Sequence, residues 1–196
     1  MKNLLGVFNF LLLLAVYLPQ TVNAQVNSQK DEKYWQDLMD LANRGDALID
    51  IGDYNAAINV FTQVINKEPN LMWRAYLERG FAYLKIDAFD SAIADFTRII
   101  QLRPADASNM HMADAFGYRG DAYLSKREYD QAIADLNEAI RLSPGYVNAI
   151  WNRGVAFYAK GEYSRAITDL ELVLRLMPDH PQARQFLDRA RQRAGR

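Results

Sequence analysis

The chain has 196 residues, of which 50% are apolar and 24% charged, and its formal net charge is −1. These fractions exclude a largely disordered chain and a protein with several membrane spans, and the near-balance of charge gives no electrostatic basis for general nucleic-acid binding. The absence of cysteine excludes disulfides, Cys-ligated zinc, iron–sulfur clusters and thiol nucleophiles. Two histidines, His111 and His180, leave little material for a metal site or a catalytic base.

Residues 1–24 have the organisation of a secretory signal peptide. Lys2 precedes an apolar stretch from Leu4 to Leu18, and the small residue Ala24 closes the segment. This stretch is shorter than the roughly 20 residues that span a bilayer. We therefore expect cleavage after Ala24 and export, so that the protein is periplasmic or secreted. The chain has no Asn-x-Ser/Thr acceptor that would argue for a eukaryotic secretory route, and a bacterial periplasm is favoured. The alternative is a segment that is retained as a membrane anchor.

Residues 25–33 are polar and are expected to form a flexible linker. The first predicted helix begins at about Tyr34, so that the folded domain takes up residues 34–196.

Beyond residue 37 the sequence repeats itself at one irregular spacing. Intervals of 35, 40 and 34 residues separate Gly45, Gly80, Gly120 and Gly154. The same intervals separate Pro69, Pro104, Pro144 and Pro178, and also Ala57, Ala92, Ala132 and Ala166. Several position classes with one shared spacing indicate a repeat of 34 residues, with one extra residue before the second copy and six before the third. The predicted copies occupy residues 38–71, 73–106, 113–146 and 147–180.

Each copy contains two stretches with the apolar period of an amphipathic helix. The recurring glycine permits a close crossing of the paired helices, and the proline ends each unit. The turn between the helices carries Gly52 and Gly161 in two copies and Asp87 and Arg127 in the other two. Because one helix pair cannot bury its own apolar faces, the copies must stack on one another.

The last predicted helix covers residues 181–194, with Pro181 at its first position and Asp179 or His180 as the cap. Ala183, Phe186 and Leu187 would face back onto the fourth copy, and arginines would cover the outer side. The fold class expected from the sequence is therefore all-α, an α-solenoid of four helix-turn-helix repeats with a C-terminal capping helix.

This pattern resembles the tetratricopeptide repeat (TPR) family over residues 38–178. The family pattern is best kept in the third copy, by Phe116, Gly120, Tyr123, Ala132, Leu136, Ala139 and Pro144. It is loosest in the first copy, where Leu41 and Leu48 replace aromatic residues. The resemblance implies a protein–protein interaction module without catalysis, cofactor or metal.

No constellation in the sequence supports an enzyme. His111 falls in the six-residue insertion and is interpreted as a surface-loop residue. An arginine precedes the repeat glycine in every copy, and copies two to four hold an aspartate (Asp95, Asp135, Asp169) at one place in the second helix. An Arg–Asp bridge between the paired helices explains both series better than a ladder of arginines for an anionic ligand. In the first copy Val60 takes the aspartate's place, so Arg44 lacks this partner.

The resemblance implies that a partner binds along the concave face formed by the first helices. The residues expected to line this groove are Asp46, Asp50, Leu77, Phe81, Leu84, Asp114, Tyr118, Asp121, Trp151, Val155 and Tyr158. Trp151 and Tyr158 are the best candidates for exposed groove residues. A groove of this kind suits an extended or helical peptide with apolar anchors and basic flanks.

Some members of the family bind the acidic C-terminus of chaperones through basic and amide groups at fixed groove positions. Those positions hold Ala42, Asp46, Phe81, Asp114 and Tyr118 here. The basic clamp is therefore absent, and this partner is not expected.

The function predicted from the sequence is an exported interaction scaffold or adaptor for a protein or peptide, with no nucleic-acid partner. The alternative is a self-assembling or membrane-tethered structural component of the cell envelope, with membrane contact only if the first segment is retained.

Overall fold

The computed structural model describes residues 32–70 and 72–195. These residues form nine helices and no strand. None of the helices is long and apolar enough to cross a membrane. The predicted signal peptide and residues 25–31 of the predicted linker lie outside the described residues, and Glu32 and Lys33 already belong to the first helix.

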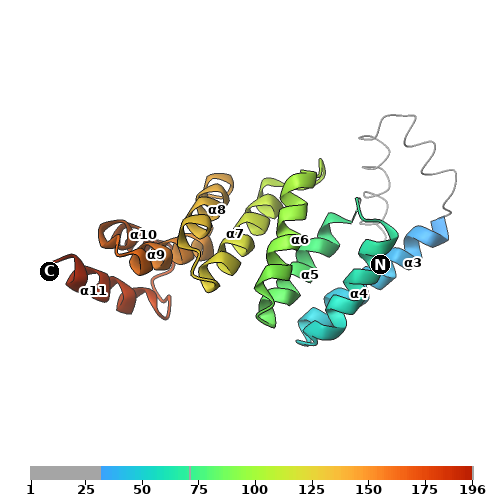
Figure 1. The fold of residues 1–196 in the computed structure, drawn as a ribbon, viewed down its shortest axis with the longest axis horizontal. Helices are drawn as coiled ribbons and strands as arrows, with labels where there is room; N and C mark the ends of the chain where they lie inside the picture. Colours follow the sequence, from blue (N-terminus) through green and yellow to red (C-terminus); the bar gives the residue numbers. More distant parts are fainter. Residues whose placement is uncertain (1–31, 71, 196) are drawn as a thin grey trace.

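The helices form four antiparallel pairs followed by a single helix (Figure 1). The first helices of the pairs are α3 (Glu32–Asp50), α5 (Trp73–Lys85), α7 (Asn109–Ser125) and α9 (Val147–Lys160). The second helices are α4 (Tyr54–Lys67), α6 (Phe89–Leu102), α8 (Tyr129–Leu142) and α10 (Tyr163–Leu176). The chain ends with α11 (Ala183–Ala194). This arrangement confirms the predicted all-α solenoid.

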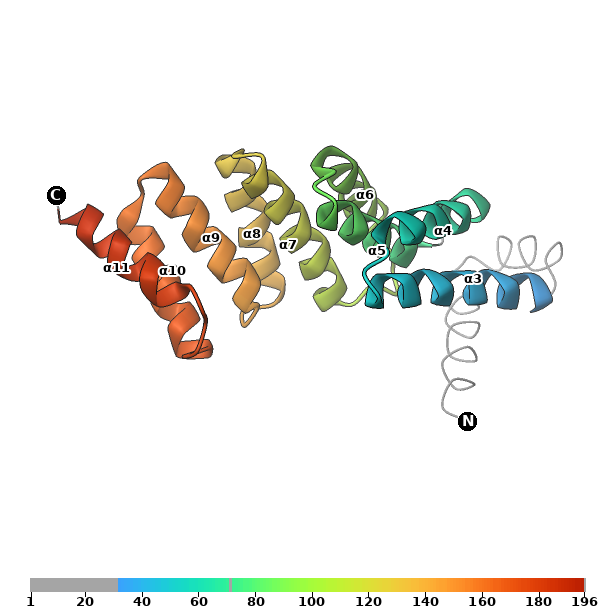
Figure 2. The same ribbon diagram turned by 90° about the horizontal axis from the view of Figure 1, so that it is seen from below.

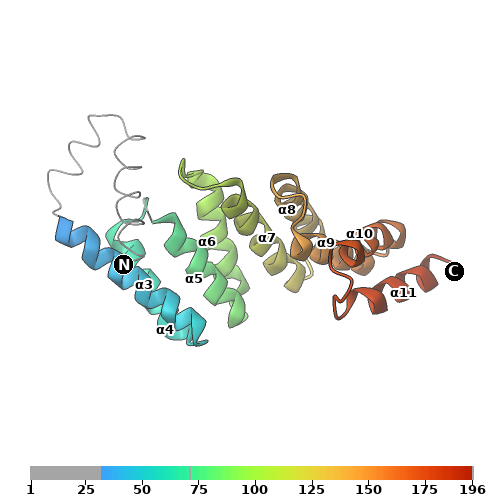
Figure 3. The same cartoon turned by 180° about the vertical axis from the view of Figure 1, so that it is seen from behind.

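The pairs stack in chain order along one axis, from α3 at one end to α11 at the other (Figure 2). Successive first helices contact one another, α3 with α5, α5 with α7 and α7 with α9. Successive second helices in the described part of the chain make no such contacts. The first helices are therefore closer together and form the inner face of the array, and the second helices form the outer face. Figures 1 and 3 show the array from opposite sides.

The recurring glycines lie where the two helices of a pair cross. A Cβ atom at Gly80 would lie 2.7 Å from the ring of Phe96, and one at Gly120 would lie 2.8 Å from Leu136. Both of these neighbours are fully buried. Gly154 has more room, because its nearest neighbour would be Asp169 Cβ at 3.2 Å.

The loops follow the predicted positions. Gly52, Asp87, Arg127 and Gly161 all have positive φ, between 57° and 82°, at the turn inside each pair. Each second helix ends two residues before the proline that closes its repeat.

An arginine in each of the last three pairs holds three helices together. Arg119 on α7 donates from Nε and Nη2 to both carboxylate oxygens of Asp135 on α8, at 2.7 and 2.8 Å. Its Nη1 donates to Thr97 Oγ1 on α6 of the preceding pair, at 2.9 Å. This confirms the predicted Arg–Asp bridge and adds a link to the preceding repeat that the sequence did not predict.

The other two arginines make equivalent contacts. Arg79 binds Asp95 and the Thr62 hydroxyl, and Arg153 binds Asp169 and the Asn137 amide oxygen. Arg44 forms no ion pair or side-chain hydrogen bond among the described residues and is exposed, in agreement with the expectation that Val60 leaves it without an aspartate partner.

The insertion before the third repeat forms a helical turn and not a surface loop around His111. Ser108 caps α7, its Oγ accepts a hydrogen bond from the His111 backbone N–H, and the His111 ring lies 4.9 Å from the Trp73 ring. Trp73 also donates to the Asp106 carboxylate at 2.9 Å. The insertion is therefore anchored on α5 by a buried tryptophan, which sequence periodicity does not reveal.

The C-terminal helix begins at Ala183, after a turn that contains Pro181 and Gln182. His180 Nδ1 accepts a hydrogen bond from the Ala183 backbone N–H at 3.2 Å, which satisfies one of the free donors at the start of the helix. Ala183 and Leu187 are buried against the fourth pair.

We predict that Gly80→Ala destabilises the fold by about 1–3 kcal/mol, because the added methyl group overlaps a buried ring that has no free space. Gly154→Ala is the matched control and should be close to neutral, since its contact is looser and alanine has the better helix propensity. Urea unfolding of both variants measures the difference. Equal losses would contradict the assigned crossing geometry.

We also predict that Asp135→Ala costs about 3 kcal/mol, because it leaves the half-buried Arg119 guanidinium without its carboxylate. The double variant with Arg119→Ala should cost less than the sum of the two single variants. Asp130→Ala, which removes an exposed partner of Lys160, should leave the unfolding midpoint nearly unchanged. If the free-energy losses of Arg119→Ala and Asp135→Ala are strictly additive in the double variant, the two side chains do not interact.

Candidate partner-binding groove

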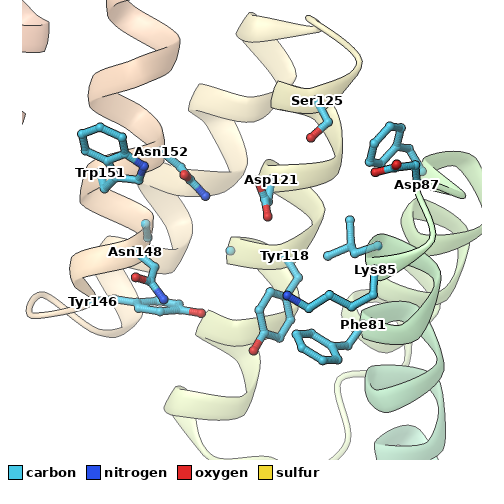
Figure 4. A pocket seen from close by; sticks show the side chains of 14 residues that line it. Phe81, Lys85, Asp87, Tyr118, Asp121, Ser125, Tyr146, Asn148, Trp151 and Asn152 are labelled. Carbon is cyan, nitrogen blue, oxygen red and sulfur yellow. The ribbon is translucent and has the colours of Figure 1, made fainter. Parts of the chain in front are cut away.

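The inner face of the array contains a hollow of about 410 Å³ between α5, α7 and α9 (Figure 4). We call it the central hollow. It is lined by Phe81, Leu84, Lys85, Asp87, Phe89, Gly117, Tyr118, Asp121, Ser125, Tyr146, Asn148, Ala149, Trp151 and Asn152. A smaller hollow of about 200 Å³ continues along α5 and the start of α7, next to Leu77, Glu78 and Asp114.

The aromatic rings of Phe81 on α5 and Tyr118 on α7 line the central hollow side by side. The Tyr118 ring lies 5.5 Å from the Phe81 ring and 5.7 Å from the Phe96 ring, measured between centroids. Tyr146, from the turn before α9, packs where Gly117 has no side chain, since a Cβ there would lie 2.9 Å from the Tyr146 ring. Figure 4 shows the Tyr146 and Tyr118 hydroxyls on the same side of the hollow.

Three half-buried carboxylates line the two hollows and have no ion-pair partner among the described residues: Glu78, Asp114 and Asp121. Burial raises the pKa of all three above the ordinary values. For Asp114 a hydrogen bond from Tyr146 offsets part of the effect on the pKa, and for Asp121 the charge of Lys85 does so. The three charges are therefore held in an environment that solvates them poorly.

The same burial acts on the tyrosines of the central hollow. Burial and the neighbouring charge of Asp114 raise the pKa of Tyr118 to about 12 and also raise the pKa of Tyr146. Both phenols are therefore neutral hydrogen-bonding groups at physiological pH.

Two cations lie at the edges of this acidic surface. Lys85 Nζ is 4.8 Å from the centroid of the Phe81 ring, and Figure 4 shows the Lys85 side chain extended across the hollow between Phe81 and Tyr118. Arg74 on α5 is exposed, and its charge lowers the raised pKa of Asp46 and Glu78.

The structure brings seven of the eleven predicted groove residues to the two hollows. They are Leu77, Phe81, Leu84, Asp114, Tyr118, Asp121 and Trp151. Asp46 and Asp50 lie on α3, outside both hollows, with Asp50 exposed near the end of the helix. Val155 and Tyr158 lie further along α9 and line neither hollow.

The sequence predicts that Trp151 and Tyr158 are exposed, but both are half-buried. The Phe186 ring of α11 lies 5.2 Å from the Trp151 ring and 5.5 Å from the Tyr158 ring, and His180 also stacks on Trp151 at 4.5 Å. The capping helix therefore covers much of these two side chains, so that their substitution would also loosen the end of the array.

Sequence reasoning missed Glu78, Asn152 and Tyr146. Glu78 and Asn152 occupy the same repeat position as Tyr118, two residues before the repeat glycine. A comparison of this position across the copies would have predicted both as groove residues. Tyr146 comes from a turn and reaches the site only because Gly117 admits its ring. No spacing in the sequence links these two residues.

The polar groups of the two hollows do not form a metal site. No group of three or more histidines, aspartates or glutamates in the described part of the chain is placed to hold a metal ion. The central hollow instead offers aromatic carbon, two asparagine amides and unpaired carboxylates, which is the composition of a recognition surface.

Comparisons with known proteins agree with the repeat pattern. The family described as "Tetratricopeptide repeat" matches residues 43–107, and the one described as "TPR repeat" matches residues 120–161. No curated protein sequence matches the chain.

Several solved structures are similar. The second TPR domain of human RPAP3, solved in complex with an HSP70 peptide, is 31% identical with a TM-score of 0.53, and the match covers 59% of this chain and 92% of that one. A crystal structure of MamA protein is 26% identical with a TM-score of 0.71, covering 81% of this chain and 82% of that one. MamA from Desulfovibrio magneticus RS-1 is 18% identical with a TM-score of 0.72, and the match covers 81% of this chain and 85% of that one. At this identity the match shows likeness of fold alone.

We predict that Asp121→Asn raises the free energy of unfolding at pH 7. Burial raises the pKa of Asp121 in the folded state, so the folded protein favours the protonated carboxyl. The contribution of this carboxyl to stability is complete below the unfolded-state pKa and is lost as the pH rises through the folded-state pKa. The amide removes this loss, and its advantage should vanish below about pH 4. Urea unfolding across this pH range measures the effect, with Asp90→Asn on the outer face as the control. A variant less stable than the parent at pH 7 would show that Asp121 supports the fold.

Proposed function

The chain belongs to the tetratricopeptide repeat family, and we propose that it is an interaction scaffold that binds a segment of a partner protein along its inner face. The observation that carries the proposal is the central hollow between α5, α7 and α9. The side chains of Asn148, Asn152 and Asp121 in this hollow form no ion pair or hydrogen bond among the described residues, whereas arginine–aspartate contacts and glycine crossings hold the helix pairs together elsewhere.

The polar groups of α9 suit the backbone of an extended segment. Asn148 and Asn152 lie one helical turn apart and line the central hollow, and their side chains make no hydrogen bond among the described residues. An asparagine amide offers a donor and an acceptor side by side, which matches the N–H and C=O groups of a peptide. Leu84 and Phe81 on α5, across the central hollow from the asparagines, and Tyr118 on α7 provide apolar contact for the side chains of the segment (Figure 4).

The inner face also indicates which partners it disfavours. The HSP70 peptide in the human RPAP3 complex ends in the acidic sequence EEVD. The two hollows of this chain present Glu78, Asp114 and Asp121 without ion-pair partners among the described residues, so that an acidic C-terminus bound there would meet like charge. We therefore propose a partner other than an acidic chaperone tail.

We also propose that the protein is exported after removal of residues 1–24. The basic start, the short apolar stretch and the small residues before Gln25 support this proposal. N-terminal sequencing of the protein from cells that produce it should yield a chain that begins at Gln25.

The binding proposal is tested by a photo-crosslinking amino acid placed at Ser125, an exposed residue that lines the central hollow. We predict discrete crosslinked partner bands from this position in cells that produce the protein. The matched control is the same amino acid at Ser91, an exposed serine on the outer helix α6, which should give little crosslinking.

Phe81→Ala in the Ser125 background should reduce the crosslinks to about a tenth or less, because aromatic anchors of an interface are commonly worth about 2 kcal/mol. Equal labelling from Ser91 and Ser125 would contradict an inner-face binding site.

A further inference from the structure

We propose that the central hollow binds a lysine or arginine side chain carried by the partner segment, and that Lys85 occupies this place in the free protein. This inference rests on the proposed function and narrows it to one class of partner, a basic segment with apolar neighbours.

The aromatic base of the hollow is arranged to receive a cation. Phe81 and Tyr118 lie side by side at 5.5 Å, and a cation held within about 6 Å of an aromatic face is attracted to it. The hollow already holds one such cation, since Lys85 Nζ is 4.8 Å from the Phe81 centroid. The Lys85 ammonium group therefore makes the contact with Phe81 that we assign to a lysine or arginine of the partner.

Charge complementarity supports the same occupant. Asp121 lines the hollow beside these rings, and Glu78 and Asp114 continue the acidic surface along α5 and α7. None of the three forms an ion pair among the described residues, whereas Asp95, Asp135 and Asp169 are each bound by an arginine. A cation from outside would therefore find carboxylates that the fold has not neutralised.

Lys85 is less firmly held than the chain's comparable lysines. Lys126 and Lys160, which also lie at the C-terminal ends of first helices, each bind two carboxylates. Lys85 has no carboxylate within ion-pair distance in the described ranges and remains exposed. Its displacement by a partner cation would therefore break no salt bridge.

The surroundings favour a peptide segment over a free small cation. At about 410 Å³ the hollow is in the size range of pockets that take a drug-sized ligand, far larger than an ammonium group alone needs. Asn148, Asn152 and Leu84 line the same space and would contact the backbone and neighbouring side chains of a segment.

The test measures fluorescence anisotropy of two labelled nonapeptides against the purified domain. One has a central lysine flanked by leucines, and the other has norleucine in place of that lysine. We expect the lysine peptide to bind at least about fivefold more tightly, and Asp121→Asn to remove that preference. Lys85→Met should strengthen binding of the lysine peptide about threefold or more and leave the norleucine peptide unchanged, because it removes the competing charge but keeps the length of the side chain.

Asp90→Asn, which removes a carboxylate from the outer face, is the charge control and should leave both affinities unchanged. Loss of folding cannot explain a loss of binding by Asp121→Asn, since this variant is expected to be more stable at pH 7 and its melting curve is recorded alongside.

Equal binding of the two peptides would overturn the assignment of the hollow to a cation, and so would the absence of any effect of Lys85→Met. The proposed function is tested separately, by crosslinking from Ser125. Nα-acetyl-lysine amide, which keeps its ε-ammonium group, is the probe for a free cation. If it binds as tightly as the lysine peptide, the hollow binds a free cation. Self-association in sedimentation that Asp121→Asn abolishes would assign it to a second copy of the chain. Each of these two results contradicts the basic partner segment.

Discussion

The architecture depends on one recurring contact, the arginine that joins three helices. In each of the last three pairs, its guanidinium binds the aspartate of its own second helix and a hydroxyl or amide oxygen of the preceding second helix. A solenoid gains stability from contacts between neighbouring units, so a group that fixes both the pair and its neighbour sets the spacing of the whole array. The planar fork of arginine suits this task because its donors point in fixed directions.

This contact divides the carboxylates of the protein into two kinds. Asp95, Asp135 and Asp169 are buried and bound by arginine, so their charges serve the fold. Asp114, Asp121 and Glu78 are half-buried on the inner face and form no ion pair among the described residues, and burial raises the pKa of each. Carboxylates that line a hollow and that the fold does not pair with a cation are well placed for a role in binding.

Residue spacing predicted the repeats, the helix crossings and the Arg–Asp bridges, because these features recur and each copy supports the others. It did not predict features that occur once. His111 belongs to a helical turn through its contact with Trp73, Tyr146 enters the site through Gly117, and Trp151 is covered by Phe186 of the capping helix. Each of these is a contact between distant residues with no periodic counterpart, and such contacts decide which part of the inner face remains open.

The open part of the inner face lies where the repeat is least regular. The six-residue insertion precedes α7, gives that helix its additional first turn and is held to α5 through Trp73. At the other end, the cap helix covers Trp151 and Tyr158 and so limits the hollow along α9. Regular stacking therefore supplies the frame, and two departures from it determine where a partner can reach aromatic rings and unpaired charge. The site still draws on the repeat, because Glu78, Tyr118 and Asn152 share one position of the first helices, and the irregular contacts at the two ends determine how far it extends.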